Sequence, residues 1–231
     1  MKLKSLIFLG SIVTMYTLQA QATSVTVKGV ITPPACNATF ESPDLILDWG
    51  NIPHSELNET TTKILPKKTA TLQVTCEPGT STRVAFWAKN AGPGIALPGQ
   101  QIELGINGSD PNRIFSLGMD PVTNASIGNF VMMPTKSTYG SETNDSNFGF
   151  VQDAGHTAIS FVPALFSSKW GITSNGSQDF TILNKDDGKV AEAANFTFSF
   201  DVVPQLNLKQ NITNAMEVPF VGTAQFYVRY F

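Results

Sequence analysis

The stretch Thr69-Ala-Thr-Leu-Gln-Val-Thr-Cys76 decides the fold class, because polar and apolar residues alternate strictly along it. Successive side chains of a β-strand point to opposite faces of a sheet, whereas a helix repeats every 3.6 residues. Ala70, Leu72, Val74 and Cys76 therefore share one face and the polar residues share the other. The stretch predicts a strand with one buried face.

The same period of two recurs in the second half of the chain. Phe196, Phe198, Phe200 and Val202 form one such series, and the last strand is predicted from Ala224, Phe226, Val228 and Tyr230. Shorter strands are predicted at 24–31, 45–49, 84–88, 101–106 and 157–162, separated by turn signals such as Asn175-Gly176. Only 187–194 has room for a turn or two of helix. We therefore predict an all-β sandwich with Greek-key or immunoglobulin-like connections.

The domain organisation is simple. Residues 1–22 resemble a secretory signal peptide: Lys2 and Lys4 precede an apolar run, and Ala20-Gln21-Ala22 has the small residues of a cleavage site. A transmembrane helix is the alternative, but the apolar run is too short to span a bilayer. We expect one β-sandwich domain over 23–231, with a long polar loop or hairpin near 135–147, in a protein exported from the cytosol.

Cys36 and Cys76 are the two cysteines of the sequence. An exported protein meets oxidising conditions, where two cysteines usually pair. We therefore predict a disulfide between them, with two free buried thiols as the alternative.

Charge and composition exclude several classes of partner. The formal net charge is −3, and removal of the two signal-peptide lysines makes it more negative. Binding to nucleic acid needs clustered Lys and Arg, which this chain does not have. No segment after the signal peptide is long and apolar enough to span a membrane.

Residues suited to catalysis are sparse. His54 and His156 have no His or Cys companions at metal-ligand spacing, so we predict no metal site and no cofactor. Asp153, His156 and Ser160 contain the side chains of a catalytic triad, but one short segment rarely supplies the geometry of a triad. Asp186-Asp187-Gly188 lacks the ligand pattern of a calcium loop and predicts a polar turn. We predict that the protein is not an enzyme.

Three tryptophans are candidates for stacking on sugars. Trp49 and Trp87 lie in predicted strands, which favours positions in the core or on the sheet surface. Trp170 lies in a predicted loop and is therefore the candidate carbohydrate contact.

Several segments, taken in order, resemble a known family. Four segments are similar to pilin subunits of the chaperone–usher class. They are the segment from Val25 through Ile31-Thr-Pro-Pro-Ala-Cys36, the element Leu45-Ile-Leu-Asp-Trp-Gly50, the strand ending at Cys76 and the C-terminal Gly222-Thr-Ala-Gln-Phe-Tyr-Val-Arg-Tyr-Phe231. Ile114-Phe-Ser-Leu-Gly118 and Ser168-Lys-Trp-Gly171 narrow the resemblance to fimbrial-like periplasmic proteins of the GltF and YhcF type, classed as a domain of unknown function.

This resemblance implies an incomplete sandwich that a strand from another protein completes. A periplasmic chaperone, and in a fibre a neighbouring subunit, adds that strand beside the last strand of a pilin. The residues at the strand-complementation edge would be Ala224, Phe226, Val228 and Tyr230. The implied partners are a periplasmic chaperone, an usher and other fimbrial subunits.

Two departures from the family pattern limit the comparison. Few residues precede Cys36 to serve as a donor strand, so we do not expect a homopolymer. Pilins also carry a glycine further from the terminus, where this chain has Glu217, Val218 and Pro219, and Gly222 is the nearest glycine.

Two functions are alternatives to the fimbrial-like subunit. One is a carbohydrate-binding adhesin module, and the other is a self-contained periplasmic protein that does not assemble.

Overall fold

The computed structural model describes residues 36–41, 45–91, 111–141, 146–152, 155–156, 164–165 and 171–231. All of them belong to one compact unit, 34–231. The predicted signal peptide, the predicted strands at 24–31, 101–106 and 157–162, and Asp153, Ser160 and Trp170 lie outside the described residues.

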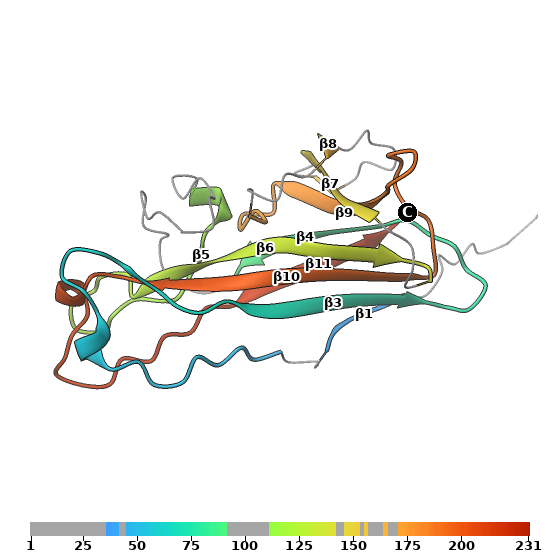
Figure 1. The fold of residues 1–231 in the computed structure, drawn as a ribbon. Coiled ribbons are helices and arrows are strands. Elements are labelled where there is room, and N and C mark those ends of the chain that lie inside the picture. The colour runs from blue at the N-terminus through green and yellow to red at the C-terminus, as the bar shows by residue number, and fades with distance from the viewer. Residues whose placement is uncertain are drawn as a thin grey trace, which may run out of the picture. The chain divides into compact units, whose positions relative to one another are not determined.

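The described chain forms two antiparallel sheets, which confirms the predicted all-β sandwich (Figure 1). The first sheet has the order β1-β3-β10-β6-β5, with β2 beside the end of β10. Its strands are β1 (Cys36–Phe40), β2 (Lys63–Ile64), β3 (Lys68–Cys76), β5 (Phe115–Ser116), β6 (Gly128–Tyr139) and β10 (Asn195–Leu206).

The second sheet has the order β11-β4-β9-β7-β8. Its strands are β4 (Val84–Asn90), β7 (Ser146–Gln152), β8 (Ala164–Leu165), β9 (Gln178–Asn184) and β11 (Ala224–Tyr230). Three short 3-10 turns complete the described elements: η1 (His54–Glu56), η2 (Pro111–Arg113) and η3 (Lys209–Asn211). The strands predicted around 69–76, 196–202, 84–88 and 224–230 are all present.

Aromatic side chains from both sheets form the core. The Phe86 ring of β4 is fully buried and lies 5.5 Å from the ring of Phe180 on β9. Across the sandwich it lies 4.9 Å from Phe198 and 5.6 Å from Phe200, both on β10. The alternation seen in the sequence of β10 thus places its phenylalanines between the two sheets.

The predicted strand at 45–49 is wrong as a paired strand. The segment is not part of either sheet, although burial alternates along it, with Leu45, Leu47 and Trp49 half-buried and Ile46 exposed. A side-chain hydrogen bond holds it, since the Trp49 indole N–H donates to the Pro66 carbonyl at 2.7 Å. The alternation correctly marks a buried face, but a buried face does not require a hydrogen-bonded neighbour.

The predicted polar loop at 135–147 is also wrong over part of its length. Strand β6 continues through Tyr139 and pairs with β10, for example Ser137 opposite Phe198. Strand β7 then begins at Ser146 in the other sheet, and the Ser137 and Ser146 hydroxyls lie 2.9 Å apart. The polar composition suggested a loop, but the hydroxyl side chains here lie in strands. The Ser137 hydroxyl of β6 bonds to the Ser146 hydroxyl of β7, which belongs to the other sheet. Residues 142–145 are not described.

The predicted polar turn at Asp186-Asp187-Gly188 is confirmed. The Asn184 side-chain oxygen accepts the backbone N–H of Asp186 at 2.8 Å, and Gly188 adopts a φ of +67°. A positive φ of this kind suits glycine. No helical turn forms within 187–194.

Candidate functional site

The last strand lies at the edge of the second sheet, as the sequence predicts. In the described part of the chain, β11 pairs only with β4, in a register that runs from Ala224 opposite Asn90 to Tyr230 opposite Val84. The inward-facing residues Ala224, Phe226 and Val228 are only half-buried, as is Tyr230. The residues of β4 opposite Phe226, Val228 and Tyr230 are fully buried, and they are Ala88, Phe86 and Val84. The core is therefore less completely covered at β11 than one strand further in.

Phe226 contacts the core and the opposite sheet. Its ring lies 5.8 Å from Phe86 and 5.7 Å from Phe200, both fully buried. It also meets the half-buried Phe40 of β1, edge to face, at 5.1 Å. Phe226 thus links the exposed border of one sheet to the exposed border of the other.

Strand β1 forms the facing border, and the predicted disulfide anchors it. Cys36 pairs with Cys76 in the register of β1 and β3, and a disulfide joins the two residues. The Tyr230 hydroxyl donates to the Cys36 carbonyl at 3.3 Å. Partial burial raises the pKa of Tyr230 above its ordinary value of 10.0. The two edge strands therefore meet through side chains.

Half-buried apolar residues continue beyond both edge strands. We call the whole set the apolar seam. It consists of Ala38, Phe40, Leu45, Leu47 and Trp49 on one side, and Val218, Phe220, Ala224, Phe226, Val228 and Tyr230 on the other. All of them pack against the buried core without being fully covered. In Figure 1 the two segments that carry them run along the same side of the sandwich.

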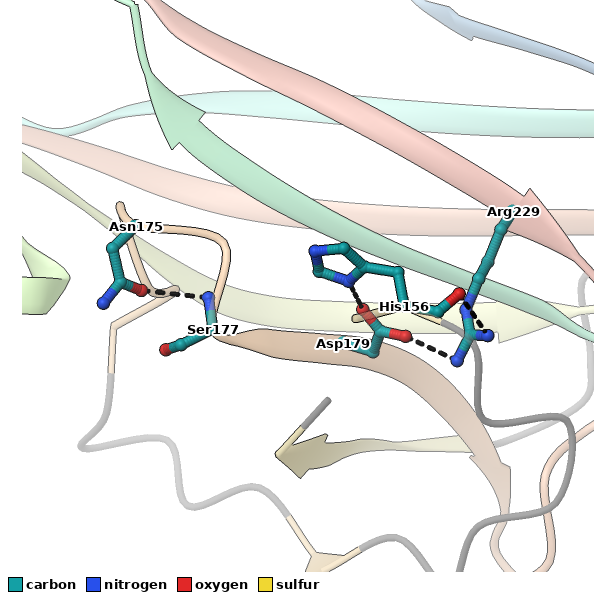
Figure 2. A network of polar contacts seen from close by, with 5 residues as sticks. All are labelled: His156, Asn175, Ser177, Asp179 and Arg229. Atoms are coloured by element: carbon teal, nitrogen blue, oxygen red, sulfur yellow. Dashed lines mark hydrogen bonds and ion pairs between the residues drawn. The ribbon is translucent and has the colours of Figure 1, made fainter. Parts of the chain in front are cut away.

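The outer face of β11 carries a different arrangement, a buried ionic network (Figure 2). Asp179 of β9 is 0% exposed, and its carboxylate lies between two cationic or hydrogen-bonding groups. The Arg229 Nη2 is 2.5 Å from Asp179 Oδ2, and the His156 Nδ1 is 2.5 Å from Asp179 Oδ1. Arg229 Nη1 also donates to the His156 carbonyl at 2.9 Å. The network ties β9, β11 and the segment at His156 together.

Aromatic rings stack beside this network. His156 lies flat on Trp87, with ring centroids 3.8 Å apart and planes 8° apart, and Trp87 stacks in turn with Tyr227 at 5.4 Å. Trp87 is therefore on the sheet surface, one of the two positions predicted for it. The rings of His156 and Tyr227 both stack with its ring. Trp49 has the Lys68 ammonium 5.2 Å from its ring centroid. Both tryptophans thus have side-chain neighbours at their rings, and Trp170 is outside the described residues.

Sequence reasoning found the edge strand and the disulfide but missed the ionic network. His156 takes a carboxylate partner from Asp179, which lies 23 residues further along the chain. Asp153, considered above, lies outside the described residues. The signal for Asp179 was a lone acid beside an apolar run, and the signal for Arg229 was a single charge in the last strand. Neither local sequence feature indicates that Asp179 and Arg229 are partners.

The described ranges hold neither a metal-binding cluster nor a membrane-spanning helix. Within these ranges, no three His, Cys, Asp or Glu side chains gather where they might hold a metal ion. No helix in the same ranges has the length and apolarity needed to cross a membrane.

Comparison with known proteins does not assign the chain to a family. No protein-family model matches the sequence, and no curated protein resembles it closely enough to count as a match.

Proposed function

We propose that this protein is an exported, non-enzymatic, fimbrial-like subunit that accepts a β-strand from a partner along the side of β11 that faces away from β4. The apolar seam carries the proposal, because the inward side chains of β11 reach the core and yet remain half-buried. A strand added along this edge would cover these side chains as those of β4 are covered.

Strand addition supplies what this edge lacks. An edge strand presents unpaired backbone N–H and C=O groups, and an added strand satisfies them. Alternate side chains of the added strand would cover Phe226, Val228 and Tyr230. The apolar surface that the added strand removes from water contributes about 25 cal/mol per Å² to the free energy of binding. Backbone pairing gives affinity, and the seam gives side-chain selectivity.

The proposed partners follow from the resemblance to pilin subunits described above. They are a periplasmic chaperone, an usher and other fimbrial subunits, in the periplasm or at the cell surface. The confirmed disulfide is compatible with such an oxidising location.

Co-purification from the periplasm tests the proposal. The protein is expressed with chaperones of chaperone–usher systems, and the fraction captured is measured for the unchanged chain, Phe226→Ser and Tyr227→Ser. The two variants are matched, because they are adjacent aromatic residues of one strand that face opposite sides of the sheet. We expect Phe226→Ser to lose capture and Tyr227→Ser to keep it.

Equal capture of both variants would contradict strand acceptance at the seam. A soluble, monomeric chain that no chaperone captures would favour the self-contained periplasmic protein. Binding to glycans that is lost on Trp170→Ala would favour the carbohydrate-binding module.

A further inference from the structure

The apolar pattern of β11 leaves its register incompletely specified. A shift by one residue would turn Phe226 and Val228 out of the core, so alternation excludes it. A shift by two residues keeps every apolar residue facing inward, because Ala224, Phe226, Val228 and Tyr230 are all apolar. Some other feature must distinguish the observed register from its two-residue neighbours.

Arg229 supplies that feature. It is the single charged residue of β11 and faces outward, opposite Ala85 of β4. Its guanidinium reaches past β4 to the buried Asp179 of β9, two strands away. In a register shifted by two, Tyr227 or Phe231 would stand opposite Ala85 instead. The Asp179 carboxylate would then be buried without its guanidinium partner.

We propose that Arg229 and Asp179 act as a positioning pair that sets the register of β11 on β4. A buried ion pair contributes little net stability, since desolvation offsets the attraction, but losing one partner is costly. Such a pair is therefore better suited to rejecting wrong registers than to strengthening the fold. The hydrogen bonds of the same network to His156 extend this discrimination to a third segment.

The arrangement of the sheet makes this anchor significant. Only two residue pairs, Ala85 with Thr181 and Phe86 with Phe180, form the ladder between β4 and β9. The ion pair spans that short ladder on the outer face, while the Phe86 and Phe180 rings stack on the inner face. If the proposed function holds, the register also decides which side chains of β11 a donor strand meets.

Cysteine cross-linking measures the register directly. Lys89→Cys is combined with Gln225→Cys, which stands opposite it in the observed register, or with Thr223→Cys or Tyr227→Cys, which would stand opposite it after a shift by two in either direction. All four positions are exposed. The cross-linked pairs are mapped by peptide mass analysis of oxidised, unreduced protein, which also confirms that Cys36 remains joined to Cys76.

Each cysteine pair is made with Arg229 and Asp179 unchanged, with Arg229→Lys, with Asp179→Asn, and with Arg229→Met and Asp179→Asn together. The last combination removes both charges of the pair. We expect the Lys89→Cys and Gln225→Cys pair to dominate while the two charges remain, including with Arg229→Lys. Shifted pairs should increase about tenfold when Asp179 is replaced.

Shifted pairs that stay as rare in folded Asp179→Asn protein as in the unchanged protein would overturn the proposal. Cooperative thermal unfolding identifies folded protein, and Asp179→Asn alone serves if the double replacement does not fold. The measurement needs no partner strand. A failure of strand capture with an intact register effect therefore counts against the proposed function and not against the positioning pair.

Discussion

Gly222 lies just before β11, where the chain passes close to β5 and β6 of the first sheet. A Cβ atom at this position would fall 2.5 Å from the Ser116 carbonyl oxygen and 2.5 Å from the Phe130 ring. The Ser116 carbonyl belongs to the backbone, so it cannot relieve the clash by a change of side-chain rotamer. The glycine that seemed out of place by comparison with pilins thus has a packing reason in this chain.

Gly222→Ala should therefore destabilise the protein, by about 1–3 kcal/mol, since overpacking forces neighbouring groups to shift. Urea unfolding monitored by tryptophan fluorescence measures the change. The neighbouring Thr223→Ala, at an exposed position, is the control and should change the free energy of unfolding little. Equal effects of the two substitutions would show that the close approach is not a constraint.

Asp120 holds two loops together through its buried carboxylate. Oδ1 accepts backbone N–H groups of Val122 and Thr123, both at 2.8 Å, and Oδ2 accepts that of Thr213 at 2.7 Å. Burial by itself would raise the pKa of Asp120, but the donors from Thr123, Thr213 and Val122 outweigh it and lower the pKa below 3.8. The charged carboxylate is therefore favoured by folding.

The lowered pKa of Asp120 predicts a pH dependence of stability. Its contribution is fully present above the unfolded pKa, near 3.8, and is lost as the pH falls through the lower folded pKa. Asp120→Asn should cost about 2 kcal/mol at pH 7, because a charged acceptor is lost and the amide N–H₂ faces the Thr213 N–H. The difference from the unchanged protein should shrink below pH 3.8. A constant difference in urea unfolding from pH 7 to pH 2.5 would contradict this assignment.

At the scale of the element, β1 depends on its disulfide. It is a five-residue strand at the edge of the first sheet in the described part of the chain, and the bond from Cys36 to Cys76 closes a sequence separation of 40. Replacing both cysteines with serine should lower the free energy of unfolding by about 3–4 kcal/mol, mainly by enlarging the unfolded ensemble. Urea unfolding measures the loss. Labelling of two free thiols in the denatured, unreduced protein would show instead that the bond does not form.

Which strands the sequence revealed depended on how they are buried. Strands β3, β10 and β11 have a polar or exposed face over much of their length, so alternation was visible. Strand β6 carries Phe130, Val131, Met132 and Met133 in succession, all buried, and β9 is buried on both faces over most of its length. A strand that is buried on both faces does not alternate between polar and apolar residues, so the period of two could not predict β6 and β9.

The candidate site divides in the same way. The inward residues of β11 follow from one local pattern and were predicted by number. The partners His156, Asp179 and Arg229 are separated by 23 and 50 residues along the chain, and only the order of strands in the sheet brings them together. Pairing of β11 with β4, and of β4 with β9, has no local signature.

At the scale of the whole molecule, strand acceptance predicts stabilisation by a donor peptide. A ligand that binds only the folded state adds about 2.7 kcal/mol of stability at one hundred times its Kd. For a domain of this size, each kcal/mol raises the Tm by roughly 2–4 °C. A synthetic peptide about as long as β11, with apolar residues at alternate positions, should therefore raise the Tm by about 5–11 °C at one hundred times its Kd.

The chain offers controls for this stabilisation. Phe226→Ser should abolish the peptide-induced rise in Tm, because it removes the side chain that reaches Phe86, Phe200 and Phe40. Tyr227→Ser, on the outer face, should retain it. A peptide of the same composition with its apolar residues placed consecutively should have little effect, since only alternation directs them all toward the seam. An equal rise in Tm with both peptides would indicate non-specific hydrophobic binding, and no rise with either would identify a sandwich that needs no partner strand.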